Sequence, residues 1–212
     1  MYIYCKRLLD IVLSFLLLVF LFPLMALVTL VIRLSMGKPV FFRQDRIGKG
    51  NLPFSIIKFR TMANNITENM SDRQRLTKVG AIIRKASIDE LPQIVNILKG
   101  DMSFIGPRPL LPEYMPYYNS REILRHEIRP GMSSLAGIKG RSNLTWEEQF
   151  EMDVFYVENL SFHLDLEIFC KTIPRVIGSA DVMVVGRKDP DRFDVYRRKQ
   201  MDALQTNQQN KY

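Results

Sequence analysis

Residues 11–32 form an apolar stretch of 22 residues that contains no ionisable side chain. A helix of this length is long enough to cross the hydrocarbon core of a bilayer. Pro23 lies in the middle of the stretch, where a proline removes one backbone hydrogen bond and crowds the preceding turn. The pattern therefore predicts a membrane helix that kinks or doubles back at its centre.

Basic residues flank this stretch on both sides, with Lys6 and Arg7 before it and Arg33 directly after it. Because Lys and Arg mark the cytoplasmic side of a membrane helix, neither end is an obvious candidate for translocation. A re-entrant hairpin fits these flanks, but an ordinary spanning anchor also tolerates a proline, so the local sequence leaves both open. A cleaved signal peptide fits less well than either, because the stretch is longer than the apolar part of a signal peptide and lacks a small-x-small cleavage pattern.

After residue 36 the period of the apolar positions changes, and each period predicts a different element. Residues 40–44 and 54–59 flank a glycine-containing turn and predict a β-hairpin. Apolar residues at helical spacing predict two helices that meet near Ser87, and two more over 146–157 and 164–177. Residues 110–118 mix apolar residues with tyrosines and prolines, which fits either a membrane-interface segment or ordinary core.

Three regions follow from these patterns. Residues 1–36 are the membrane anchor, residues 37–185 form one compact domain of the α/β class that is mainly helical, and residues 186–212 form a charged, flexible tail rich in Gln and Asn. The formal net charge of +8 favours an anionic partner, such as phosphate groups, nucleotides, anionic lipid or nucleic acid. The two cysteines, Cys5 and Cys170, indicate neither a disulfide framework nor a cysteine metal site.

The junction between the two central helices is the chemically richest segment. Ser87, followed by Glu90 three residues later, matches a capping box and places Asp89 and Glu90 in the first turn of the second helix. The helix dipole would favour their ionised forms. An ionised carboxylate near Arg84 suits attack on a phosphorus centre or binding of a divalent cation, although acidic residues are also common in first turns as dipole partners.

Two stiff turns lie downstream. Pro107 and Pro109 flank Arg108 and would present its guanidinium to a phosphate at little entropic cost, or would form a rigid turn with a solvated arginine. A glycine-rich segment that ends at Arg141 would let backbone amides approach a ligand closely. This segment matches no Walker or dinucleotide-binding fingerprint. His126 and His163 have no spaced partner, which is typical of structural or solvated histidines.

The order of these segments resembles the bacterial sugar transferases known as small monotopic phosphoglycosyl transferases. The resemblance covers roughly residues 1–175. It rests on the basic-flanked apolar stretch, on Phe-Phe-Arg-Gln-Asp-Arg-Ile-Gly at 41–48, Lys-Phe-Arg-Thr-Met at 58–62, Ser-Ile-Asp-Glu-Leu-Pro-Gln at 87–93, Leu-Lys-Gly-Asp-Met-Ser at 98–103, Gly-Pro-Arg-Pro at 106–109 and Arg-Pro-Gly at 129–131.

The resemblance implies a two-step transfer of a phosphosugar from a UDP-sugar to membrane polyprenol (undecaprenyl) phosphate, with release of UMP. Asp89 corresponds to the nucleophile, and Glu90 to the second acid, which would position Mg²⁺ together with Asp89. Substrate- and phosphate-binding roles are implied for four basic residues: Arg84, Arg108, Arg141 and Lys58. Asp165 matches an acidic position of the family, and its contact with the site is left open.

The resemblance also implies a broken, re-entrant membrane helix with both ends on the cytoplasmic face of the bacterial inner membrane, and amphipathic helices at the interface. Membrane lipid is then a partner and nucleic acid is not, and a dimer is possible.

Two features depart from the family: Phe22 precedes the proline where many members have serine, and residues 132–139 differ from the common pattern. Two alternatives stay open, a membrane-tethered basic binding module without catalysis and a family fold that has lost activity.

Overall fold

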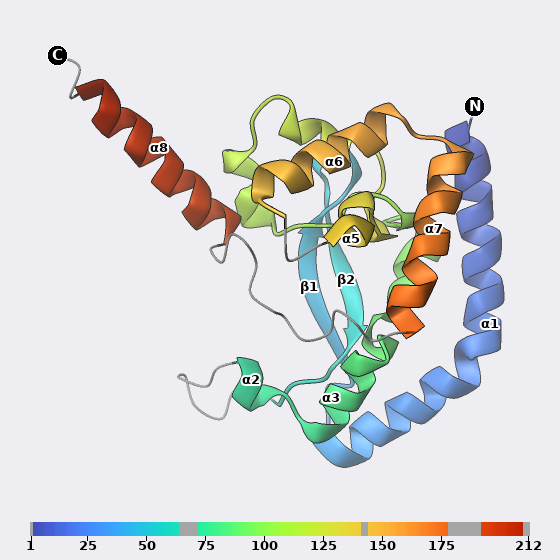
Figure 1. Ribbon diagram of the computed structural model, residues 1–212. Helices are drawn as coiled ribbons and strands as arrows, with labels where there is room; N and C mark the ends of the chain where they lie inside the picture. The colour runs from blue at the N-terminus through green and yellow to red at the C-terminus, as the bar shows by residue number, and fades with distance from the viewer. Residues whose placement is uncertain (1, 64–71, 141–143, 178–191, 210–212) are drawn as a thin grey trace.

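A computed structural model describes residues 2–63, 72–140, 144–177 and 192–209 of the chain. Helix α1 (Tyr2–Met36) contains the whole apolar stretch and bends partway along its length, as Figure 1 shows. In the part of the chain that the structure describes, it is the one helix long and apolar enough to cross a membrane. The bend agrees with the kink that Pro23 predicts.

The predicted β-hairpin is confirmed. Strands β1 (Phe41–Ile47) and β2 (Pro53–Phe59) are antiparallel, and their register runs from the pair Phe41–Phe59 to the pair Ile47–Pro53. The short 3₁₀ helix η1 (Lys49–Asn51) makes the turn. Gly50 and Asn51 both have positive φ there, 66° and 64°, a conformation that Gly and Asn adopt more readily than other residues.

Helix α4 (Gln93–Lys99) lies against the edge of β2 that β1 leaves free. The buried carboxamide of Asn96 serves that edge: its Oδ1 accepts a hydrogen bond from the backbone N of Ile57 (3.1 Å), and its Nδ2 donates to the carbonyl of Ser55 (2.9 Å). One side chain thus satisfies two backbone groups that would otherwise need a third strand. The hairpin and α4 therefore form one rigid unit.

Two helices meet near Ser87, as predicted, and both are short. Helices α2 (Asp72–Arg75) and α3 (Lys78–Lys85) precede this residue, and η2 (Ile88–Glu90) follows it before α4 begins. Downstream, β3 (Ser103–Ile105) and β4 (Gly131–Ser133) pair in parallel, a contact that the sequence did not predict. The pair depends on close backbone approach, since a Cβ at Gly131 would lie 2.1 Å from the backbone N of Gly106.

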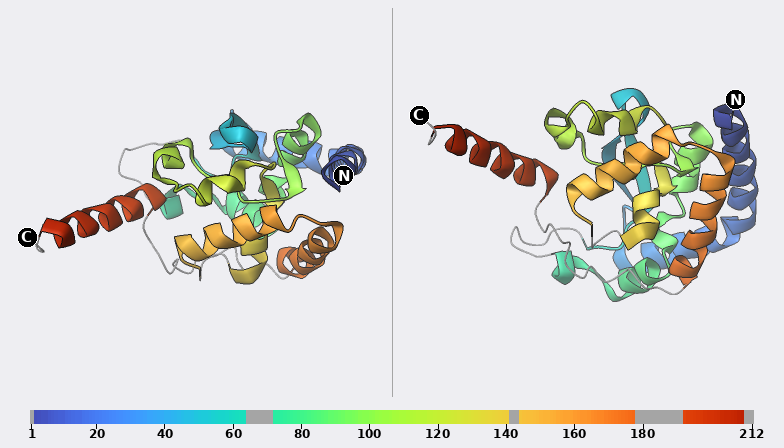
Figure 2. Two further views of the ribbon diagram at one scale, coloured as in Figure 1. Left: turned by 90° about the horizontal axis from the view of Figure 1, so that it is seen from above. Right: turned by 45° about the horizontal axis from the view of Figure 1, so that its top comes forward.

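The remaining elements close the domain: η3 (Pro112–Tyr117), η4 (Glu122–His126), α5 (Leu135–Gly140), α6 (Trp146–Glu158) and α7 (Phe162–Ile177). The two predicted C-terminal helices correspond to α6 and α7. In Figures 1 and 2, α7 runs beside the first half of α1. Of the two interpretations of residues 110–118, ordinary core is correct for Leu110 and Tyr114, which are buried in an aromatic cluster with Trp146, Phe150 and Phe193.

The predicted C-terminal tail contains helix α8 (Phe193–Gln209), and its flexibility stays a prediction. Amino-acid composition does not predict how this helix is attached. The ring of Phe193 is fully buried against Trp146 and Phe150 and anchors the start of α8. An ion pair between Arg197 and Glu122 adds a polar contact beside it. The rest of α8 projects away from the domain (Figure 1).

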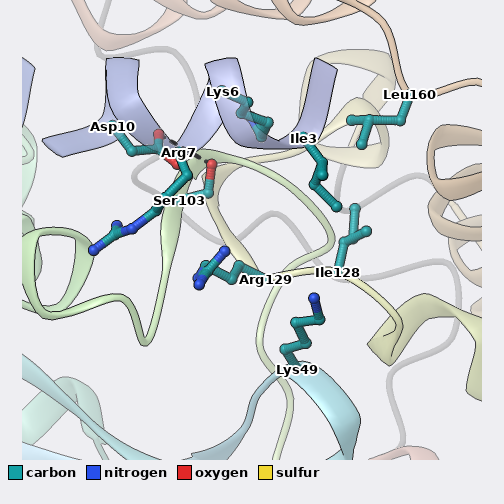
Figure 3. Close-up of a pocket in the computed structure, with 9 residues that line it drawn as sticks. All are labelled: Ile3, Lys6, Arg7, Asp10, Lys49, Ser103, Ile128, Arg129 and Leu160. Carbon is teal, nitrogen blue, oxygen red and sulfur yellow. Dashed lines mark hydrogen bonds between the residues drawn. The ribbon is translucent and has the colours of Figure 1, made fainter. Parts of the chain in front are cut away.

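Polar groups dock the first half of α1 on the domain. Arg7 donates to the carbonyls of Ile97 (2.6 Å) and Leu98 (2.9 Å) at the end of α4, where a cation also complements the helix dipole. Asp10 is buried and accepts hydrogen bonds from the hydroxyl of Ser103 (3.1 Å) and the backbone N of Phe104 (3.2 Å). Figure 3 shows Asp10 directed at Ser103 from α1.

Asp165 extends this docking to α7. Its carboxylate pairs with Lys6 (2.7 Å) and accepts hydrogen bonds from the hydroxyls of Tyr2 and Tyr156. Asp165 therefore joins α1, α6 and α7. The cavity in Figure 3, which Lys6 and Arg7 border, has a volume of about 20 Å³, room for a single water molecule.

The other end of α1 is held as firmly. Arg60, directly after β2, is 6% exposed, and its guanidinium donates to the carbonyls of Met36 (2.6 Å), Gly37 (2.8 Å) and Lys38 (3.2 Å). Met36 is the last residue of α1, where carbonyls have no partner inside the helix, and Gly37 and Lys38 follow it directly. Both ends of the apolar helix are thus bound by buried polar groups to the same domain.

The buried ring of His126 gives the fold a pH dependence. Its Nδ1 lies 2.8 Å from Oδ1 of Asn51 in the hairpin turn, and burial, followed by the charge of Arg125, lowers its pKa from 6.5 to about 3. Below pH 6.5 the unfolded chain therefore takes up a proton that the folded chain excludes. From pH 7.5 to 5.5 this linkage lowers the free energy of unfolding by about 1.4 kcal/mol.

We therefore expect thermal unfolding in detergent to shift to lower temperature between pH 7.5 and 5.5, and to shift less in His126→Asn. Asparagine keeps a polar group at the position of Nδ1 but does not titrate. The comparison is between the two pH-dependent shifts, because the substitution also lowers stability at pH 7.5. An equal shift in both proteins would contradict the assignment to His126.

Candidate active site

A cavity of about 550 Å³ brings the membrane helix and the acidic pair together. One part of its wall is apolar and comes from the middle of α1, where Leu21 and Leu24 lie on either side of Pro23. The part that carries Asp89 and Glu90 comes from η2. The other described residues that line it are Arg84, Ala86, Ser87, Ile88, Leu91, Phe104, Ile105, Met132, Ser133, Gly137, Ile138, Phe169 and Thr172.

The backbone at Ser87 presents the acidic pair. Ser87 adopts the left-handed conformation (φ 55°, ψ 17°), which ends α3 and turns the chain into η2. Asp89 and Glu90 lie in the first turn, as predicted, but the capping box is wrong, because the Ser87 side chain makes no capping hydrogen bond. An N-cap residue needs extended backbone, and this residue is left-handed. Thr145 and Glu148 form a true capping box on α6.

Glu90 and Asp89 have different surroundings. The carboxylate of Glu90 pairs with Lys58 of β2 at 2.6 Å. Asp89 is half-buried, and burial, followed by the charge of Glu90, raises the pKa of its carboxyl group, while Lys58 and Arg84 act in the opposite direction. The expectation that the helix dipole favours ionisation is therefore corrected: η2 is one short turn, and desolvation outweighs its field.

Arg84 reaches this site from the last turn of α3. Its Nε donates to the hydroxyl of Thr61 at 2.9 Å, and its side chain borders the cavity. Because its charge opposes the rise in the pKa of Asp89, it stabilises the carboxylate form. Arg84, Lys58 and the acidic pair thus form one cluster in which two cations face two carboxylates.

Of the two remaining predicted basic residues, Arg108 and Arg141, the structure describes only Arg108. Among the described residues, Arg108 is not part of the cavity wall; its carbonyl accepts a hydrogen bond from the buried Arg125 (2.8 Å). Its charge and, more strongly, burial lower the pKa of Arg46 on β1. Arg141 lies outside the described residues. The phosphate-binding roles of both arginines stay predictions.

Sequence reasoning missed several residues of the cavity. The hydroxyls of Ser133 and Thr172 lie 2.6 Å apart and supply polar groups on the side formed by β4 and α7. Phe169 of α7 borders the cavity and is 51% exposed. A helical period places Phe169 on the same face as Phe162 and Leu166, but no local signal shows which cavity that face reaches. Asp165, whose contact with the site was open, belongs to the docking of α1 instead.

The donor groups present suit a hard cation only in part. No group of three or more His, Cys, Asp or Glu side chains that would hold a metal ion occurs among the described residues. Asp89 and Glu90 supply two carboxylates. Mg²⁺ is commonly held by one or two carboxylates, and phosphate oxygens of the substrate and water complete its octahedron. The pair therefore fits Mg²⁺ when a diphosphate is bound, and it does not form a closed metal site alone.

Comparisons with known proteins identify the family of the chain. The family model of bacterial sugar transferases matches residues 1–179. The uncharacterized sugar transferase EpsL of Bacillus subtilis is 44% identical over 191 residues, which cover 89% of this chain and 95% of the relative. A UDP-glucose:undecaprenyl-phosphate glucose-1-phosphate transferase of Caulobacter vibrioides is 38% identical, and the match covers 81% of this chain and 69% of the relative. The exopolysaccharide production protein ExoY of Sinorhizobium fredii is 36% identical, and the match covers 81% of this chain and 84% of the relative.

The family match extends from α1 through the whole of α7 and includes the acidic pair and the apolar helix that borders the same cavity. The resemblance that the motifs indicate is thereby confirmed, as is the prediction of a transferase. The chain belongs to the bacterial sugar transferase family, and its relatives are of the type that acts on polyprenol phosphate.

Proposed function

We propose that this protein transfers a phosphosugar from a UDP-sugar to undecaprenyl phosphate and releases UMP, as the first membrane step of glycan or polysaccharide assembly. The observation that carries the proposal is the shared cavity: Asp89 and Arg84 line it together with Leu21 and Leu24 of the apolar helix. A polyprenol phosphate is a charged group on an apolar chain, and this cavity offers a charged wall and an apolar wall to match.

In the proposed chemistry Asp89 is the nucleophile. A carboxylate oxygen forms a bond to the sugar-linked phosphorus, the bond from that phosphorus to the bridging oxygen of the diphosphate breaks, and UMP leaves with the electron pair. A phosphate oxygen of the acceptor then attacks the same phosphorus and displaces Asp89. Arg84 stabilises charge on the transferred phosphoryl group, and Lys58 holds Glu90 beside it. The family resemblance supports these roles.

Mg²⁺ is part of the proposal because of the charge balance. Asp89, Glu90, Lys58 and Arg84 together carry no net charge, so a diphosphate would bring about two uncompensated negative charges into the cavity. Asp89 and Glu90 would hold the ion, which supplies neutralisation of the phosphate oxygens. The residues of the chain orient the donor and supply the nucleophile.

We propose further that α1 is re-entrant, with both ends on the cytoplasmic face of the bacterial inner membrane. A straight helix of 35 residues would be about 52 Å long, more than the hydrocarbon core needs. Lys6 and Arg7 bind one end to the domain, and Arg60 binds the other. A domain that holds both ends cannot lie on both sides of a bilayer.

An exposed apolar stripe on α7 supports this orientation. Phe162, Leu166, Phe169 and Ile173 are between 43% and 57% exposed and recur at helical spacing. Many exposed residues of α1 are also large and apolar, and α7 runs beside the first half of this helix (Figure 1). Together these faces form a continuous surface for the acyl boundary of one leaflet.

The enzyme hypothesis predicts that Asp89→Asn abolishes acceptor-dependent UMP release, since an amide is not a nucleophile here. Purified protein in nanodiscs would be incubated with a panel of UDP-sugars, Mg²⁺ and undecaprenyl phosphate, and intact mass would show a sugar-phosphate adduct in the wild type only. The wild-type rate should fall toward acid pH earlier than for an ordinary aspartate, because the pKa of Asp89 is raised. Glu158→Gln, an exposed change on α6, is the control with full turnover. Turnover in Asp89→Asn would exclude this nucleophile.

Removal of divalent cations with EDTA should stop UMP release, and added Mg²⁺ should restore it. The second measurement is thermal: UDP with Mg²⁺ should raise the melting temperature of the wild type, and the rise should shrink in Glu90→Gln, which loses one ligand. UMP release that persists in EDTA would contradict the role of Mg²⁺ without touching that of Asp89.

Re-entry predicts that epitope tags at both termini face the cytoplasm. Protease added to inverted inner-membrane vesicles should remove both tags, and protease added to intact spheroplasts should remove neither. A periplasmic domain serves as the positive control for spheroplasts. Removal of the N-terminal tag from spheroplasts would show a spanning helix instead.

A further inference from the structure

We propose that Thr61 is a positioning residue that orients the guanidinium of Arg84 toward the phosphates of the donor. The inference rests on the proposed function, because it names a residue that acts on that site through its contact with Arg84. Thr61 itself does not line the cavity; it is the second residue after β2, between the strand and α3, and is 4% exposed.

The hydroxyl of Thr61 contacts Arg84 at its Nε, at 2.9 Å. A guanidinium has five N–H donors in one plane, and a hydrogen bond at Nε fixes that plane while it leaves the two terminal nitrogens for an anion. Arg84 borders the cavity beside Asp89. The terminal nitrogens are therefore available for a bidentate contact with a phosphoryl group.

The backbone of Thr61 is itself fixed. Its carbonyl accepts hydrogen bonds from the backbone N (3.3 Å) and the hydroxyl (3.2 Å) of Thr77, the N-cap residue of α3. Gly80 packs on the same carbonyl so closely that a Cβ there would lie 1.9 Å from its oxygen. The backbone of Thr61 thus holds the start of α3, and its side chain holds Arg84 in the last turn of the same helix.

The hydrogen bond between Thr61 and Arg84 matters for the rate because an arginine side chain has many rotamers. An arginine without a partner loses side-chain entropy when it is ordered. A misplacement of about 1 Å in a catalytic group lowers a rate about 100-fold. Thr61 would order the Arg84 guanidinium before the donor binds, so that donor binding loses less side-chain entropy.

A double-mutant cycle on UMP release separates this role from a structural one. Thr61→Val keeps the shape of the side chain and removes the hydroxyl, and we expect it to lower kcat/KM for the UDP-sugar about 10- to 100-fold. Thr61→Ser keeps the hydroxyl and should stay within about threefold of the wild type. In an Arg84→Ala background, Thr61→Val should change kcat/KM by less than about twofold, because the residue acts through Arg84.

Thr145→Val is the matched control, since it also removes one threonine hydroxyl, at the N-cap of α6. It should lower the melting temperature and leave kcat/KM unchanged. A normal kcat/KM in Thr61→Val would overturn the inference, and so would an equal loss in the Arg84→Ala background. Loss of activity in Thr61→Ser would show that shape, not the hydroxyl, matters.

Binding of the UDP-sugar distinguishes failure of the inference from failure of the proposed function. If the wild type released no UMP, the proposed function would fail, yet calorimetric Kd values for the UDP-sugar panel would still test Thr61. A Kd raised at least threefold in Thr61→Val but not in Thr61→Ser would support the positioning role. Equal Kd values in all three proteins would overturn it.

Discussion

The attachment of both ends of α1 to one domain is the constraint on which the rest of the structure depends. An apolar helix of this length has no reason of its own to stay with a polar domain. Buried polar contacts supply that reason: Arg7 binds the end of α4, Asp10 binds β3, and Arg60 binds the end of α1 itself. Each group would be costly to leave unpaired, so the attachment is directional as well as stable. The bend in α1 allows both ends to reach this one domain.

The same attachment assembles the site. The α4 helix, whose C-terminal end binds Arg7, follows the acidic pair, and Asn96 fixes it to the hairpin that carries Lys58. Arg60 and Thr61 are neighbours at the end of β2: one holds the membrane helix, and the other holds Arg84. The end of α1 and the guanidinium of Arg84 are therefore held by two consecutive residues. In the proposed function, this links the helix that borders the lipid substrate to the arginine that binds the soluble one.

Local features of the chain could be predicted from sequence, and contacts between distant segments could not. The apolar stretch, the hairpin and the helix junction at Ser87 each depend on periodicity or turn chemistry within a few residues. The pairing of β3 with β4 joins two three-residue strands across many residues, and neither strand has a recognisable pattern. Likewise, Phe193 stands in a charged segment, and only its burial among Trp146 and Phe150 explains why α8 starts there. The acidic pair could be singled out because its residues are adjacent, whereas no local signal shows that Arg108 lies outside the cavity wall.

The arrangement of the cavity walls also assigns a direction to the proposed reaction. Leu24 and Phe169 are 37% and 51% exposed and border the cavity from two helices whose outer faces are apolar. In the proposed orientation these residues face lipid, so an acceptor enters from that side with its prenyl chain still in the membrane. Glu90 pairs with Lys58 of the hairpin on the charged part of the wall. We propose that the phosphates of the soluble donor bind at this charged part, so that both substrates reach Asp89 within one cavity.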